Sequence, residues 1–248
     1  AALPARRGRA AEAAAGERVV WSGGTRLDAF SDDGDGTWSC ALPAWAAAGE
    51  APAFRSLWIA DGRGAWAGHP EPGHFLHIES IPESDRGAKW TDGPRAFTYA
   101  PADAAIWERV APGAEVVTFT RWVDTHLRVA AIDRSARIVR FTSPNTFELQ
   151  PGDLYRIEGA PGLLDAPGEW CTGADSRLRL RAAAAPAAVV APRLSTLLRI
   201  AGDAAGGHLV EHVTFRGIAF EHARWWFDAG SAVTWPSKDV IGFVQAAF

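Results

Sequence analysis

Short runs in which apolar and polar residues alternate recur along most of the chain, and this alternation predicts β-strands rather than helices. Such runs, rich in β-branched and aromatic residues, lie at residues 18–21, 56–59, 74–78, 115–123, 127–129, 137–141 and 178–180. Turn-forming clusters separate them, for example at residues 112–113 and 151–153. Many short strands joined by turns are typical of an antiparallel β-sandwich or barrel.

The stretch VTFRGIAFEH at residues 213–222 has a different pattern, because its apolar residues alternate before Gly217 and again after it. A single residue is too short for a hairpin loop, so the glycine predicts a corner between two strands of one coil. Coils of this kind stack into a right-handed parallel β-helix, and stacking removes their inward faces from water. Four side chains are therefore expected to be buried: Val213, Phe215, Ile218 and Phe220.

Three motifs in order along the chain resemble a known group of proteins: GLLDAPGEW at residues 162–170, then VTFRGIAFEH, then VQAAF at residues 244–248. The resemblance is to secreted β-helix proteins that act on carbohydrates, near glycoside hydrolase family 141, and it covers residues 17–248. It implies an all-β chain with a pectate-lyase-like parallel β-helix into which an antiparallel β-sandwich or barrel domain is inserted. It also implies a secreted or cell-surface location and a polysaccharide or oligosaccharide partner.

The domain organisation expected from this resemblance has four parts. Residues 1–16 form an irregular tail, residues 17–34 an early β-helix strand, residues 35–185 the inserted domain, and residues 186–248 the first coils of the β-helix. The sequence contains no Met and no signal peptide, and its last eight residues are an apolar run with no polar cap. We therefore expect a truncated, N-terminal portion of a longer protein.

Charge and hydropathy exclude two classes of partner. The formal net charge of -4 gives no general attraction to nucleic acid or to an anionic membrane. No apolar run approaches the roughly 20 residues that a membrane-spanning helix needs. We expect neither nucleic acid nor membrane as a partner, and the sequence leaves the oligomeric state open.

Glycoside hydrolysis requires two carboxyl groups on either side of the scissile bond. The resemblance places these acids beyond residue 248, so the chain alone is expected to be inactive. Asp165 and Glu169 flank a Pro-Gly turn, and we expect them to accept hydrogen bonds from its backbone N–H groups. Glu221 and His222 end a predicted strand, where they face either solvent or a substrate groove.

Tryptophans near the C-terminal end could hold a sugar, because a flat indole buries the apolar face of a pyranose ring. The alternative is that they pack beneath the β-helix, and the charged residues beside them could bind hydroxyl groups or be solvated. The full set of candidate substrate-binding residues is Glu221, His222, Trp225, Trp226, Trp235, Lys238 and Asp239.

The sequence predicts no metal site and no cofactor. The acidic run DAFSDDGDG at residues 28–36 lacks the spacing and the terminal Glu of a calcium-binding EF-hand loop, so we interpret it as a hairpin turn. Cys40 and Cys171 are the two cysteines, and they could form a disulfide or remain as two buried thiols.

Three functional hypotheses follow. The first, which the resemblance favours, is the N-terminal part of a secreted polysaccharide-degrading glycoside hydrolase. The second is a non-catalytic carbohydrate-binding or adhesin module. The third is a polysaccharide lyase or epimerase, which would need a basic residue to abstract a proton next to a uronic carboxyl group. No cluster of Lys, Arg and acidic residues in the sequence supports that third chemistry.

Overall fold

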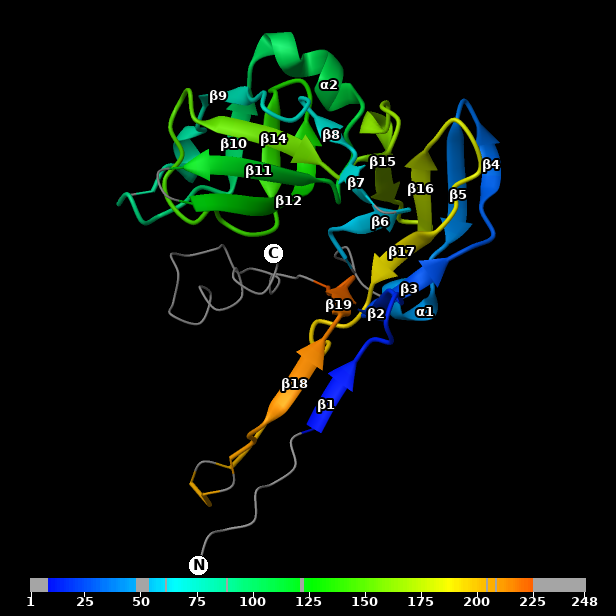
Figure 1. Ribbon diagram of the computed structural model, residues 1–248. Coiled ribbons are helices and arrows are strands. Elements are labelled where there is room, and N and C mark those ends of the chain that lie inside the picture. Colours follow the sequence, from blue (N-terminus) through cyan, green and yellow to red (C-terminus); the bar gives the residue numbers. More distant parts are fainter. Residues whose placement is uncertain are drawn as a thin grey trace, which may run out of the picture.

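A computed structural model of the chain describes residues 9–47, 54–60, 62–87, 89–120, 123–203, 205–207 and 209–224. These residues form an all-β protein, as the sequence predicts, with two larger sheets side by side and two short strand pairs, one beside the second sheet and one that extends away from it (Figure 1). Among these residues, no helix has the length and hydropathy to span a membrane.

The first unit is a closed barrel of six antiparallel strands, in which β11 pairs with β12 on one side and with β14 on the other. Its strands, with β8 added at the edge, are β8 (Gly68–His69), β9 (Leu76–Ser80), β10 (Ala96–Tyr99), β11 (Glu115–Thr120), β12 (Val123–Asp133), β13 (Ile138–Phe141) and β14 (Leu154–Glu158). Helix α2 (Ala104–Glu108) lies over the barrel (Figure 1). Its buried Trp107 stacks on Tyr99 and donates a hydrogen bond to the Tyr155 hydroxyl at 3.2 Å.

The second unit is a half-barrel sheet of eight strands. In sheet order they are β3 (Gly24–Leu27), β17 (Val189–Pro192), β6 (Leu57–Ile59), β7 (Gly62–Trp66), β15 (Glu169–Thr172), β16 (Arg177–Arg181), β5 (Thr37–Ala41) and β4 (Ser31–Gly34). The short helix α1 (Ala44–Ala47) follows β5. Trp170 is fully buried in this unit between the rings of Phe54 and Trp66, at centroid distances of 5.4 and 5.9 Å.

The acidic run at residues 28–36 contains strand β4 and, at residues 35–36, the predicted hairpin turn that joins β4 to β5. Gly34, Asp35 and Gly36 all have positive φ. The Asp32 carboxylate accepts a hydrogen bond from the Gly34 N–H at 2.8 Å, and the Asp33 carboxylate accepts one from the Ser39 hydroxyl at 2.7 Å. The carboxylates therefore satisfy donors of their own turn.

The prediction of a right-handed parallel, pectate-lyase-like β-helix is wrong for the described residues. Most strand pairs are antiparallel, and the parallel pairing at the predicted coil is confined to two isolated pairs, β1 (Arg9–Glu12) with β18 (Val213–Arg216) and β2 (Val19–Ser22) with β19 (Ile218–Glu221). Within the described ranges no third strand stacks on either pair.

The burial expected of the coil also fails. Val213 is 37% exposed and Phe220 is 41% exposed, whereas a β-helix coil would bury both. Gly217 does separate the two strands with a φ of +68°. Phe220 and Phe215 instead pack edge-on against Trp21, at centroid distances of 5.4 and 5.8 Å. Alternation around a glycine thus specified two strands and a bend, but not what lies against them.

A buried ion pair joins the barrel to the half-barrel. Arg55, next to Phe54 of the half-barrel core, donates to both carboxylate oxygens of Glu115 on β11, with an Nη2–Oε1 distance of 2.6 Å. The Glu115 side chain is 5% exposed. His126 on β12 lies beside the pair, with Nδ1 3.5 Å from Glu115 Oε2. The Arg55 guanidinium also lies over the Trp66 ring, 5.6 Å from its centroid.

Replacing Trp170 tests the half-barrel core. Trp170→Ala should lower the free energy of unfolding by about 3–5 kcal/mol, because it leaves a cavity and removes the indole donor that bonds to the Gly64 carbonyl. Chemical denaturation measures this loss. The same substitution at Trp21, which is 37% exposed, is the control and should cost clearly less. Equal losses at the two positions would contradict the assignment of Trp170 to the core.

Replacing Arg55 tests the junction. Arg55→Met should cost about 3–5 kcal/mol at neutral pH, because it leaves the buried Glu115 carboxylate without its guanidinium partner and with only His126 beside it. The matched control is Arg26→Met, which breaks the exposed Arg26–Asp28 pair and should cost no more than about 1 kcal/mol.

The loss caused by Arg55→Met should also depend on pH. Burial opposes ionisation of Glu115, but the hydrogen bond from His126 and the charge of Arg55 outweigh it and hold the pKa of Glu115 below its usual value. At pH values above the pKa that Glu115 has in the unfolded chain, the wild-type ion pair stabilises the fold fully. This stabilisation is lost as the pH falls through the lower pKa that Glu115 has in the folded protein. Without Arg55, burial has the larger effect on the pKa of Glu115 and favours its protonated form. The loss of unfolding free energy caused by Arg55→Met should therefore become smaller as the pH falls and Glu115 is protonated. A loss that is the same at pH 7 and in acid would contradict this account.

Candidate functional site

Two of the sequence-predicted site residues lie at the end of β19, in a group contributed by three distant parts of the chain. Glu221 is the last residue of β19 and is the register partner of Ser22 on β2. Its Oε1 accepts a hydrogen bond from Arg18 Nη2 at 2.8 Å. We call the following residues the strand-end group: Arg18, Ser22, Trp58, Arg63, Glu221 and His222.

His222 turns away from the strand with a φ of +59°, a conformation that few residues other than glycine adopt readily. Its Nδ1 lies 2.8 Å from the Ser22 hydroxyl oxygen. Its ring meets the Trp58 ring edge-on at a centroid distance of 5.1 Å. A Cβ at Gly24 would lie 3.0 Å from the His222 Cβ, so glycine at that position permits the close approach.

Trp58 brings β6 of the half-barrel into the strand-end group. Arg63 is the register partner of Trp58 on β7, and its guanidinium lies over the indole, 5.1 Å from the centroid. The group therefore contains an indole, two guanidinium groups, an imidazole, a hydroxyl and a carboxylate. Side chains of these kinds can form hydrogen bonds with a polar ligand, and an indole can cover the apolar face of a ring.

The strand-end group does not have the geometry of a nucleophilic triad. The Ser22 hydroxyl contacts Nδ1 of His222, and Glu221 Oε2 lies 4.0 Å from Nε2, which is too long for a hydrogen bond. The Gly24 N–H, which could have bound an oxyanion, donates to the Ser22 hydroxyl oxygen at 3.2 Å. Binding through hydrogen bonds is the chemistry that this arrangement supports.

The other five candidates lie outside the described residues: Trp225, Trp226, Trp235, Lys238 and Asp239. Sequence reasoning missed Arg18, Ser22, Trp58 and Arg63. Ser22 and His222 are 200 positions apart, so no local motif could have paired them.

Glu115 and Glu158 form a pair of acids at directly opposite positions of β11 and β14. Burial raises the pKa of Glu158, whereas the pKa of Glu115 is held low by His126 and Arg55 against the effect of burial. Opposite shifts of this kind can mark a catalytic acid and base. Here both oxygens of Glu115 accept from Arg55 and the side chain is almost fully buried, so the pair belongs to the junction.

A second acidic cluster, Glu71, Asp165 and Glu169, brings carboxylate oxygens within 4.8 Å of one another. Glu169 Oε2 accepts hydrogen bonds from the backbone N–H groups of Asp165 and Ala166, both at 2.9 Å, as predicted for an acid at this turn. Asp165 instead pairs with Arg109 at 2.7 Å. Because two of its three members already have structural partners, the cluster is explained by the turn.

No protein-family model matches the chain, and no curated protein is similar to it in sequence. Among solved structures, one described as "Glycoside hydrolase" superposes on 85% of this chain with a TM-score of 0.67 and 21% sequence identity. The chain spans 38% of the length of that structure's chain. At this identity the likeness concerns the fold, so the described fold is similar to part of a glycoside hydrolase structure.

Thiol reactivity tests whether either cysteine is available as a nucleophile. Cys40 and Cys171 are both free and buried, and burial raises their pKa values to about 11 and about 12. At pH 8 almost no thiolate is present, so neither should react with Ellman's reagent in the folded protein within minutes. Both should react after denaturation. Rapid labelling of one thiol in the native state would contradict this assignment.

Proposed function

We propose that this chain is part of a glycoside hydrolase that acts on polysaccharide, and that the strand-end group contacts the saccharide. The observation that carries the proposal is the fold likeness to a glycoside hydrolase over 85% of the chain. The composition of the strand-end group supports it, because an indole beside hydrogen-bonding side chains suits a pyranose ring. A polymeric substrate also favours a protein that works outside the cell or at its surface.

We propose membership of the glycoside hydrolases in general and no particular family among them. The motif resemblance to family 141 implied a parallel β-helix, which the described residues do not form, so the narrower family assignment has lost its structural support.

We further propose that the two catalytic carboxylates lie outside this chain. Glu115, Asp165 and Glu169 are held by Arg55, Arg109 and backbone N–H groups, and Glu221 is paired with Arg18. The chain also spans only 38% of the length of the similar structure's chain. We therefore propose that the acids lie in a part of the hydrolase that corresponds to the remaining length. A non-catalytic carbohydrate-binding module is the second candidate, and the engagement of these acids in structural contacts favours it.

The test combines turnover with binding. The purified chain should hydrolyse neither aryl glycosides nor plant polysaccharides, and it should bind oligosaccharides weakly by calorimetry. Glu221→Gln removes the charge and one acceptor oxygen, and His222→Ala removes the imidazole. Each should weaken that binding about tenfold, because each loses hydrogen bonding worth about 1–2 kcal/mol.

Glu12→Gln is the matched control, because Glu12 pairs with Arg216 at 3.1 Å on the other parallel strand pair. It should leave binding unchanged. A chain that binds no saccharide would overturn the proposed function. Turnover that disappears in Glu221→Gln would show instead that the active site lies within this chain, because removal of a true acid or base costs orders of magnitude in rate.

A further inference from the structure

Arg63 brings a set of hydrogen-bond donors to the strand-end group that the described protein does not use. Its guanidinium lies over the Trp58 ring, 5.1 Å from the centroid, and the residue is exposed to solvent. Within the described ranges, its side chain forms neither a salt bridge nor a hydrogen bond. A guanidinium carries five N–H donors in a rigid plane, and contact with an aromatic ring does not consume them.

The half-barrel sheet fixes the position of these donors. Arg63 on β7 and Val190 on β17 are both register partners of Trp58 on β6. Partners in neighbouring strands lie on the same face of a sheet, so the three side chains share one face. Leu57, the neighbour of Trp58 in the chain, lies on the opposite face, where it is fully buried in the half-barrel core. Arg63 and Trp58 therefore belong to the outer face.

The charges of the strand-end group favour an anionic ligand. The group contains two guanidinium groups, those of Arg18 and Arg63, but one carboxylate, that of Glu221. Arg18 neutralises this carboxylate, because its Nη2 lies 2.8 Å from Glu221 Oε1. The charge of Arg63 is thus the one that the group leaves uncompensated.

Two more arginines are held beside the strand-end group by their backbones. The Arg193 N–H donates to the Gly23 carbonyl at 2.9 Å, and the Arg224 N–H donates to the Leu194 carbonyl at 2.8 Å. In the part of the chain that the structure describes, neither guanidinium is in a salt bridge, and the buried Nε of Arg224 has no hydrogen-bond partner. Their charges add to a positive potential that attracts anions.

A carboxylate is the anion that matches the geometry of Arg63. Its two oxygens lie in one plane and can accept two parallel N–H bonds from a guanidinium. Such charge-assisted bonds are stronger than bonds to a neutral hydroxyl group. In a polysaccharide this carboxylate is that of a uronic acid, in which it is attached directly to the pyranose ring.

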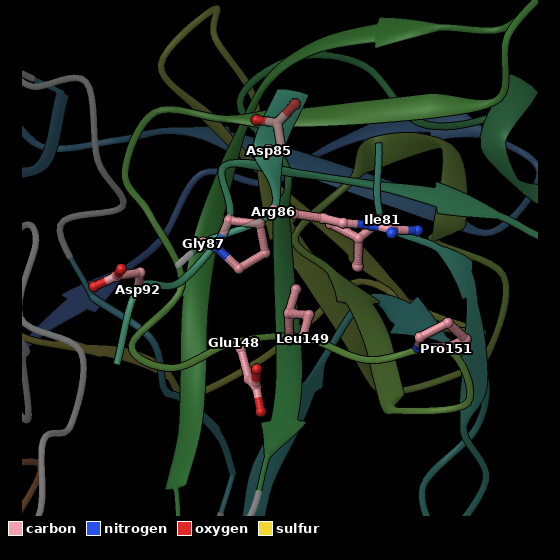
Figure 2. Close-up of a pocket in the computed structure, with 9 residues that line it drawn as sticks. Ile81, Asp85, Arg86, Gly87, Asp92, Glu148, Leu149 and Pro151 are labelled. Atoms are coloured by element: carbon pink, nitrogen blue, oxygen red, sulfur yellow. The ribbon is translucent and has the colours of Figure 1, made fainter. Parts of the chain in front are cut away.

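The pocket between two loops at one end of the barrel does not offer this chemistry. Figure 2 shows Asp85 and Asp92 among the residues that line it. Asp85 pairs with Arg140 at 3.3 Å, and the Asp92 carboxylate accepts a hydrogen bond from the Lys89 N–H at 3.1 Å. These carboxylates are engaged within the protein, and their charge would repel a uronate.

We propose that Arg63 makes the strand-end group selective for acidic saccharides, because its exposed guanidinium binds the carboxylate of a uronic acid unit. This selectivity rests on the proposed function, in which the strand-end group contacts the saccharide. It adds the chemical class of that saccharide and the residue that selects it.

The test compares acidic ligands with neutral ligands of the same shape. The full chain is titrated by calorimetry with hexagalacturonate and hexamannuronate, with the methyl ester of each, and with cellohexaose. At least one uronate should bind about tenfold more tightly than its methyl ester, because esterification removes the charge-assisted hydrogen bonds. This difference should become smaller as salt is added, since salt screens exposed charges.

Arg63→Gln should abolish the preference: it should bind that uronate about tenfold more weakly than the wild type and bind the methyl ester equally well. Arg63→Lys keeps the charge but not the planar set of donors, so its affinity should be intermediate. Arg95→Gln is the matched control, because Arg95 is also exposed and donates to the Thr142 carbonyl at 2.7 Å on the barrel. It should keep the preference. Circular dichroism confirms that each variant is folded.

The outcomes separate this selectivity from the proposed function. Methyl esters or cellohexaose that bind as tightly as the uronates, or a uronate preference that persists in Arg63→Gln, would overturn the selectivity and leave the proposed function standing. A chain that binds none of the five ligands would overturn both. A sulfated galactan hexasaccharide is the last ligand, and tighter binding of it than of either uronate would overturn the assignment to uronic acids in favour of sulfate esters.

Discussion

The Arg55–Glu115 ion pair links the two units at a junction where the Ala67 backbone also bonds to Trp170 of the half-barrel and to Gly159 beside the barrel. Each unit has its own core, one around Phe97, Trp107 and Tyr155 in the barrel and the other around Trp170 in the half-barrel. Between them a guanidinium and a carboxylate are both withdrawn from water, which is costly unless their geometry is nearly ideal. The paired hydrogen bonds from Arg55 to both Glu115 oxygens meet that requirement.

Neighbouring side chains hold the two partners of this ion pair in one orientation. His126 approaches Glu115 from β12, and Trp66 lies beneath the Arg55 guanidinium. A Cβ at Gly159, just after β14, would lie 2.7 Å from a Trp66 ring carbon, so glycine there lets the barrel approach this ring. An apolar contact could slide, whereas charges that must meet at defined atoms fix one orientation. We therefore expect the ion pair to favour one orientation of the two units at the junction.

Two buried acids of the described residues are occupied by donors of this chain, Glu115 at the junction and Glu169 at its own turn. A hydrolase needs two carboxyl groups that can reach the substrate, yet Glu115 and Glu169 are buried and occupied by donors of this chain. The strand-end group, by contrast, brings an aromatic ring together with hydrogen-bonding side chains, and the saccharide contact that we propose depends on this combination.

The sequence by itself determined the local structure. Alternating apolar residues predicted the all-β class and the positions of about half of the strands, the acidic run at residues 28–36 was interpreted as a hairpin turn, and Gly217 predicted a bend between two strands. It also predicted that Glu169 satisfies the donors of its own turn. These features follow from interactions between residues that are close in the chain, which is the range over which a sequence pattern carries information.

The tertiary structure alone decided how the strands associate and which side chains meet. Alternation shows that one face of a strand is apolar, but it does not identify what covers that face, so the expected β-helix coil is instead a pair of isolated parallel strand pairs with Val213 and Phe220 exposed. Closure of the barrel through β11 and β14 placed Glu115 opposite Glu158, and the return of β19 to β2 placed His222 on Ser22. Such contacts depend on pairing between strands tens to hundreds of residues apart, and no local pattern specifies that pairing.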